Sequence, residues 1–384
     1  MMPLLPQSWS HSLSWALYHF LWQAGVAAMA LWLACRLLQN ASPRSRYLCS
    51  WLALVLCVAL PVVTFLRFLS HADPSSGLVR TVESLKLVWQ LGPVTFQQST
   101  SGFPVLGVRM NEAQQNKTVA VLSVLGGAWM LGSGLMLWRL RRRWSVLVWH
   151  TRNDEPAPPS AIALVDSTAR EMGMRHPPET KQSLALGSAV VMGVWRPTLV
   201  LPAGFVESLD QDEAKMLVGH ELAHMIRRDP IWNFVQCLIE TLLFWHPAAL
   251  WITNRIRNER ELCSDELAVV RLGQPHRLAD ALAQLAAHHP HKACLTLGAN
   301  QGALLERVRQ LLGSDFPKPL QPLRLAFALA AMPVSLVAAF AAHVAMGPVE
   351  SPPKATAPSS EAPAAKRLYL PRPDDAKNRS SNSQ

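Results

Sequence analysis

Two histidines four residues apart, with a glutamate directly after the first, form the pattern with the clearest chemical use in this chain: His220-Glu221-Leu222-Ala223-His224. In a helix, residues four apart share one face, so both imidazoles can point at one metal ion. Glu221 could then reach a water on that ion and take its proton. The same three fixed positions also arise by chance on charged surface helices, so the surrounding sequence has to decide.

The sequence around this motif predicts a helix with the motif in its middle. Asp210 and Glu213 have the spacing of a capping box, and Ser208 is a second candidate cap. Pro230 prevents the helix from continuing much further. Ligands in the middle of a helix are held more rigidly than ligands at a frayed end.

A zinc peptidase needs a third protein ligand and an open fourth position for water. The best candidate is Glu261, because Asp265 lies four residues later on the same helix face. Asp265 could accept the second ring N–H of a ligand histidine and fix its orientation. Glu259 and Cys263 are alternative ligands, and an ordinary solvated acidic helix is the alternative to any metal role.

The composition indicates a membrane protein. Half of the 384 residues are hydrophobic and 16% are charged, against about 25% charged in soluble domains. Four apolar runs are long enough to span a bilayer. They are Leu13–Leu38, Leu48–Leu69, Val119–Trp138 and Leu323–Met346.

The basic residues near these runs predict the orientation. Arg44 and Arg46 lie between the first two runs, Arg139 begins a basic cluster after the third, and Lys318 precedes the fourth. Four spans place all of these on the cytoplasmic side, with both termini outside. The net charge of +10 is then mostly a matter of membrane topology, and no basic–aromatic pattern indicates nucleic acid.

The predicted fold class is a four-span membrane α-helical protein with a cytoplasmic α+β zinc metallopeptidase domain of the gluzincin type. Residues 1–69 form a helical hairpin, 70–118 an extracytoplasmic loop, and 119–138 the third span. The peptidase domain covers 139–322, the fourth span 323–346, and a disordered Pro-rich tail 347–384. The lipid is expected to be that of a bacterial inner membrane.

Several elements are predicted inside the peptidase domain. After a linker at 153–160, a helix over Ala161–Met174 precedes strands at Thr180–Leu186, Ser188–Val194 and Thr198–Leu201, and a further amphipathic helix covers Ala303–Leu312. Because an exposed edge strand commonly pairs with an extended substrate, we expect Ala189, Val190, Val191 and Met192 to dock the substrate. The alternative is an ordinary core hairpin.

The apolar stretch Ile231–Ile252 is long enough for a fifth span. A complete crossing would carry the chain about 30 Å and separate Glu261 from His220. We therefore predict two apolar helices with a break at His246-Pro247, packed in the domain or dipping partly into the bilayer.

The peptidase region contains no tyrosine that could stabilise the oxyanion formed during amide hydrolysis. His246, Arg228 and Arg255 are the candidate donors instead. Each has another explanation, since His246 could cap a helix and the arginines could face lipid head groups.

Taken together, these motifs resemble the membrane zinc peptidases of the beta-lactam sensor-transducer family. The resemblance covers roughly residues 10–345. It rests on four segments in this order: the HExxH helix, Arg227-Arg228-Asp229, Phe244-Trp245-His246-Pro247, and Glu261 to Asp265. It implies one zinc ion bound by His220, His224 and Glu261, with Glu221 as the base. A similar ExxxD arrangement occurs in membrane proteases that cut prenylated proteins.

The resemblance implies a function, with one departure. The antibiotic sensors of the family carry a penicillin-binding domain after the last helix, whereas the tail at 347–384 has no Ser-x-x-Lys motif, so direct beta-lactam sensing is not expected. The expected function is a zinc metalloendopeptidase that cleaves a cytoplasmic repressor. A membrane quality-control protease and a non-catalytic zinc scaffold are the alternatives. Expected partners are a protein substrate, membrane lipid and a second copy of the chain, with no direct nucleic acid.

Overall fold

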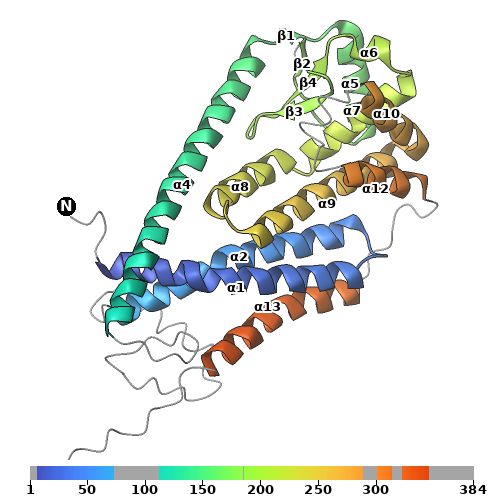
Figure 1. The fold of residues 1–384 in the computed structure, drawn as a ribbon. Coiled ribbons are helices and arrows are strands. Elements are labelled where there is room, and N and C mark those ends of the chain that lie inside the picture. The colour runs from blue at the N-terminus through green and yellow to red at the C-terminus, as the bar shows by residue number, and fades with distance from the viewer. Residues whose placement is uncertain (1–6, 73–111, 185, 289–300, 314–321, 346–384) are drawn as a thin grey trace, which may run out of the picture. The chain divides into compact units, whose positions relative to one another are not determined.

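A computed structural model describes residues 7–72, 112–184, 186–288, 301–313 and 322–345 (Figure 1). The predicted extracytoplasmic loop lies largely outside the described residues, and the predicted disordered tail lies wholly outside them. The described residues belong to one compact unit of the chain.

Four helices contain the predicted membrane runs: α1 (Gln7–Leu37), α2 (Pro43–Ala72), α4 (Glu112–Asn153) and α13 (Pro322–Ala345). Two described stretches are long and apolar enough to cross a membrane, Ala16–Leu37 in α1 and Pro43–Arg67 in α2. A shorter apolar stretch, Pro322–Ser335, lies in α13. The third and fourth spans therefore stay predictions.

The peptidase region contains a four-stranded sheet in the order β1-β2-β4-β3. Its strands are β1 (Glu155–Pro156), β2 (Thr180–Ser183), β3 (Val190–Met192) and β4 (Thr198–Pro202). The predicted hairpin is confirmed, because β3 and β4 pair antiparallel. Gly193 allows their turn, since its φ is +92° and a Cβ there would meet the Arg196 carbonyl oxygen at 2.7 Å.

Two strand predictions need correction. The segment 153–160, predicted as a linker, contributes β1, which pairs antiparallel with β2 through Glu155 and Gln182. The strand predicted over Thr180–Leu186 ends at Ser183, and β2 pairs with β4 in parallel. Local sequence could not show either feature, because the pairing partners of β1 and β2 are distant along the chain.

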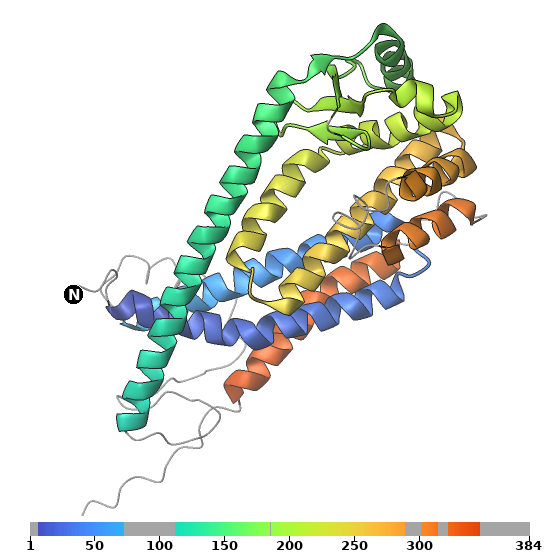
Figure 2. The same cartoon turned by 45° about the horizontal axis from the view of Figure 1, so that its top comes forward.

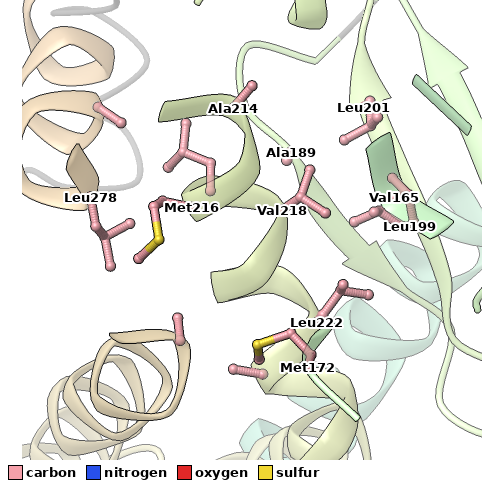
Figure 3. Close-up of a cluster of buried hydrophobic side chains, with 14 of the residues drawn as sticks. Val165, Met172, Ala189, Leu199, Leu201, Ala214, Met216, Val218, Leu222 and Leu278 are labelled. Carbon is pink, nitrogen blue, oxygen red and sulfur yellow. The ribbon is translucent and has the colours of Figure 1, made fainter. Parts of the chain in front are cut away.

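Seven helices complete the described part of this region. They are α5 (Pro159–Glu171), α6 (Phe205–Ser208), α7 (Gln211–Ile226), α8 (Asp229–Leu242), α9 (Pro247–Leu272), α10 (Pro275–His288) and α12 (Gln301–Leu312). The helices predicted over Ala161–Met174 and Ala303–Leu312 correspond to α5 and α12. Apolar residues of α5, β4, α7 and α10 interlock in one core that includes Val165, Leu199, Leu222 and Leu278 (Figure 3).

The motif helix α7 begins after Asp210, as predicted, but the predicted capping box does not form. The Asp210 side chain makes no cap hydrogen bond and instead lies 3.7 Å from Arg277. Glu213 accepts a hydrogen bond of 3.0 Å from Gln284 of α10. Tertiary partners therefore take both carboxylates away from the helix end.

The predicted break is confirmed, because α8 ends at Leu242 and α9 begins at Pro247, with His246 as its N-cap residue. The two helices form a hairpin (Figure 2). Helix α8 has 14 residues and is therefore about 21 Å long, at about 1.5 Å per residue. The part of α9 from Pro247 to Glu261 is about as long. The chain thus leaves the region of α7 along α8 and returns along α9.

The α8–α9 turn packs against the apolar helices. Trp129 of α4 donates a hydrogen bond of 2.8 Å to the Leu242 carbonyl. Gly132 of α4 lies so close to Phe244 that a Cβ would meet its ring at 2.4 Å. Ile252 and Ile256 of α9 belong to a second core, shared with α1, α2 and α13. One helix, α9, therefore joins both cores.

Candidate metal centre and active site

Three side chains from two helices converge in the way that the sequence predicts. His220 and His224 come from α7 and Glu261 from α9, and their ligand atoms all lie within 4.8 Å of one another. The two Nε2 atoms are 3.2 Å apart. Glu261 lies 3.4 Å from His220 Nε2 and 3.8 Å from His224 Nε2.

These distances fit a metal ion. Ligand atoms at about 2.0–2.2 Å from a tetrahedral zinc ion are separated by about 3.4 Å, the edge of such a tetrahedron. The observed distances of 3.2, 3.4 and 3.8 Å bracket that value. Two nitrogens and one carboxylate oxygen are also a donor set that zinc accepts.

The first histidine is oriented by a carboxylate and an arginine. His220 Nδ1 lies 2.8 Å from Asp265 Oδ1, although the ring N–H is not aligned with that oxygen as in a regular hydrogen bond. Arg307 of α12 donates to both oxygens of Asp265, at 2.7 and 2.8 Å, and lies 3.5 Å from Glu261. The predicted place of Asp265 beside a ligand histidine is thus observed.

Sequence reasoning missed Arg307. A signal was present, because Arg307 lies on the face of α12 whose Leu304, Val308 and Leu311 contact the peptidase core. An arginine among core-facing apolar residues needs a buried carboxylate partner. The identity of that partner depended on how α12 packs against α9.

The second histidine has its own carboxylate, also missed from sequence. His224 Nδ1 lies 2.8 Å from Asp229 Oδ2 and 3.1 Å from the Ser264 hydroxyl. Arg227 donates to the same Asp229 oxygen at 3.1 Å. Asp229 follows the motif in the Arg227-Arg228-Asp229 run, so an acid five residues after His224 was the available signal. Each histidine therefore has Nε2 directed at the ligand cluster and Nδ1 close to an acid.

The charges around the cluster are strongly coupled. Burial lowers the pKa of His220, but the Asp265 carboxylate outweighs it and raises the pKa to about 10. Burial raises the pKa of Asp265, but Arg307 and His220 outweigh it and lower the pKa to about 2. Burial likewise opposes ionisation of Glu261, yet His224, His220 and Arg307 hold its pKa well below the usual range.

Glu221 occupies the position expected of a base. It follows His220 in α7 and is partly buried. Burial raises its pKa, and both histidines act in the opposite direction, which places the carboxylate in the field of the ligand cluster. The preceding Gly219 permits the close approach of α9, since a Cβ there would meet Leu272 at 2.3 Å.

The alternative ligands lie elsewhere. Glu259 is fully buried, where Arg46 of α2 donates to both its oxygens at 2.9 Å and Arg255 forms a second ion pair. Cys263 is buried and contacts Arg227, and burial raises its pKa to about 11 despite that arginine. Neither belongs to the ligand cluster found among the described residues.

Among the described residues, no hydrogen bond or ion pair joins the three proposed oxyanion donors to the ligand cluster. His246 begins α9, where its Nδ1 accepts from the Ala248 amide and its Nε2 lies 3.1 Å from the Leu21 carbonyl. The prediction that it serves the site was therefore wrong, and its alternative role as a helix cap holds. Arg255 pairs with Glu259. Arg228 is exposed at the α7–α8 junction, in a left-handed conformation with φ 59°.

The predicted substrate strand lies at the edge of the sheet. Val190, Val191 and Met192 form β3, which has β4 on one side only, and Ala189 precedes it as a buried residue. Helix α7 contacts β3 directly. The strand is thus an edge beside the motif helix, while its pairing with a substrate stays a prediction.

The apolar helices and the cluster of two histidines and a glutamate are features of the membrane metallopeptidase class. Residues 15–311 match the family described as BlaR1 peptidase M56, and the chain belongs to that family. The match agrees with the resemblance inferred from the motifs. Membership implies a metal cofactor, for which His220, His224 and Glu261 are the candidate site.

Two relatives are similar to parts of the chain. The regulatory protein BlaR1 of Bacillus licheniformis is 25% identical over 104 residues, which are 27% of this chain and 17% of that protein. A protease HtpX homolog of Methanothermobacter thermautotrophicus is 28% identical over 156 residues, 34% of this chain and 60% of that protein. The chain thus covers less than two thirds of the length of either relative.

Proposed function

We propose that this chain is a zinc metalloendopeptidase that cleaves a protein substrate at the cytoplasmic face of a bacterial inner membrane. The observation that carries the proposal is the convergence of His220, His224 and Glu261 at the spacing of a tetrahedral site. The acids beside both histidines support it, because such partners orient metal-bound imidazoles.

The residues of the site have distinct roles in the proposed reaction. His220, His224 and Glu261 would hold one zinc ion, which would supply Lewis acidity and lower the pKa of a water. Glu221 takes the proton of the attacking water and later returns it to the leaving amine. Asp265 and Asp229 hold the two imidazoles in place, and Arg307 holds Asp265. An extended substrate would pair with β3.

The α8–α9 hairpin supports a site at the membrane surface. Its turn contacts Leu21 of α1 and Trp129 of α4, which lie inside the first and third predicted spans. Its other end carries Glu261, two residues after Glu259, which accepts a hydrogen bond from Arg46 at the predicted cytoplasmic start of α2. We infer that the turn enters the bilayer, while the active site stays at the cytoplasmic surface.

Substitution of Glu221 by Gln tests the proposed peptidase activity and the role of Glu221 as its base. Cleavage should fall by about 10²–10⁴-fold, because the base is lost, while bound zinc per chain stays unchanged. The assay uses the full chain in detergent with a protein substrate, and metal content is measured on the same sample. Unimpaired cleavage by the purified variant contradicts the role of Glu221. Absence of cleavage by the wild-type chain favours the non-catalytic scaffold.

We further propose that the cleavage is regulatory and acts on a cytoplasmic repressor. The name of the BlaR1 relative, a regulatory protein, supports this, and the orientation predicted from the basic residues agrees with it. Comparing cellular proteomes with the wild-type and Glu221→Gln chains should show one transcriptional regulator accumulating uncut. Accumulation of many unfolded membrane proteins would instead favour the quality-control function.

A further inference from the structure

One face of α4 carries three arginines where the predicted third span ends. Arg139, Arg142 and Arg143 share this face with Trp138 and Leu135, because the spacings of three, four, seven and eight residues follow the helix period. Arg141 points away from the face, at about 100° per residue. Positive residues at the cytoplasmic end of a span are expected, but topology alone does not require them to share one face.

This face lines an open cavity of about 740 Å³ between α4 and the sheet. Its walls come from α4, from Asp154 just before β1, from Ser183 of β2 and from Met192 of β3. The volume lies within the usual range of ligand pockets, about 300–1,000 Å³. The cavity is separate from the metal cluster, none of whose residues line it.

The cavity has an apolar part and a cationic part. Leu135, Trp138 and Val146 line it and are 50%, 54% and 51% exposed, although all three are large apolar side chains. Arg142 lies over the Trp138 ring, 5.8 Å from its centroid. Such an arrangement suits an amphiphile whose chain covers the apolar residues and whose head group meets the arginines.

The charged groups of the cavity do not satisfy one another. In the part of the chain that the structure describes, none of the three arginines forms an ion pair. Asp154 Oδ2 is buried and has no hydrogen-bond partner there. A ligand with an anionic head group would give the three arginines the partner that they lack. With three arginines and one carboxylate, the balance of charge favours an anion.

We propose that this cavity binds an anionic phospholipid of the cytoplasmic leaflet, for which phosphatidylglycerol is the test ligand. The phosphate lies on Arg139, Arg142 and Arg143, which can bind it in bidentate fashion. One acyl chain lies along Leu135 and Trp138, on the bilayer side of the arginines. Because Met192 lines the same cavity, the lipid contacts the edge strand β3. The proposal does not depend on catalysis.

The test measures retained lipid on the purified full chain. The protein in detergent is mixed with equal amounts of phosphatidylglycerol, phosphatidylethanolamine and phosphatidylcholine of the same acyl chains. After gel filtration, bound lipid is identified by mass spectrometry. The wild-type chain should retain phosphatidylglycerol in preference to both others, and excess inorganic phosphate should not displace it, since phosphate lacks the acyl chain. Equal retention of the three lipids, or displacement by inorganic phosphate, overturns the proposal.

Two variants and a matched control sharpen the test. The double variant Arg142→Lys/Arg143→Lys keeps the charge, and so the topology, but loses the guanidinium forks, so retention should fall by about fivefold. Leu135→Trp should lower retention by filling the apolar part of the cavity on the bilayer side of the arginines. Arg141→Lys, on the other face of the same helix, should retain as much as wild type. Unchanged retention in the double variant, or loss in the control, overturns the proposal, provided that all variants keep the wild-type Tm.

Discussion

Helix α9 carries two acids, only two residues apart, whose surroundings differ. Glu259 is fully buried and has two arginines as partners, Arg46 and Arg255. Glu261 is 35% exposed and has two imidazole nitrogens within 3.8 Å. Two positions along a helix are about 200° apart, so the two carboxylates point in nearly opposite directions. Glu259 points toward α2, and Glu261 points toward α7.

This difference shows how a carboxylate becomes available for metal binding. The charge of Glu259 is already neutralised, so a cation there would have to displace two arginines. Glu261 has Arg307 at 3.5 Å, but Arg307 gives its two hydrogen bonds to Asp265. The same residue type is structural on one face of α9 and a candidate ligand on the other because of its partners alone.

The largest expected effect comes from Glu261→Ala. Zinc affinity should fall by more than the roughly 10–100-fold that loss of an outer partner costs, because a direct ligand is removed. Cleavage should become undetectable. Zinc per purified chain, measured by elemental analysis, checks this outcome. Full zinc retention would show that Glu261 is no more a metal ligand than Glu259 is.

Removing Glu259 should affect folding rather than metal. Glu259→Gln leaves the buried Arg46 without its charge partner, so the chain should lose about 3–5 kcal/mol of stability. The variant should still bind zinc in the folded fraction. Thermal unfolding in detergent measures the loss.

A double variant provides the control for Glu259. Arg46→Met/Glu259→Met replaces the buried pair by apolar groups and should recover most of the lost stability, while Arg255, about a third exposed, can turn to solvent. If the double variant instead loses zinc, then Glu259 contributes to the metal site and the comparison fails.

Arg307→Lys should have an intermediate effect. The lysine keeps the charge but cannot give Asp265 the two parallel hydrogen bonds of the guanidinium group. Because Asp265 lies beside His220, zinc affinity or activity should fall by about 10-fold. Competition with a zinc chelator measures the affinity. A loss of stability with unchanged zinc affinity would make Arg307 a purely structural residue.

The smallest effect is expected from Cys263→Ala. Cys263 lies between the ligand Glu261 and the acid Asp265 in sequence, but its contacts are with Arg227 rather than with the metal ligands. Zinc content should therefore match wild type within error, with a stability loss of about 1 kcal/mol typical of a small core change. Any loss of zinc would indicate that the Cys263 thiolate is a metal ligand.

Much of the site could be read from the sequence because its geometry is local. His220 and His224 share a face by helix period alone, and Glu261 and Asp265 do so for the same reason. The return of α9 to α7 also followed from the requirement for one shared metal site. A complete membrane crossing between the two helices would have separated Glu261 from His220 by about 30 Å. The failed capping box and the role of His246 show the limit, since tertiary contacts there redirect side chains whose local pattern was correct.

The sequence by itself determined the residue types, the helix that presents the two histidines, the break at His246, and the family to which the chain belongs. Only the tertiary structure decided that Glu261 faces the histidines while Glu259 faces Arg46, and that Arg307 and Asp229 support the two imidazoles. The physical reason is that helix period fixes which residues share a face, whereas the partner of each face depends on packing between segments distant along the chain.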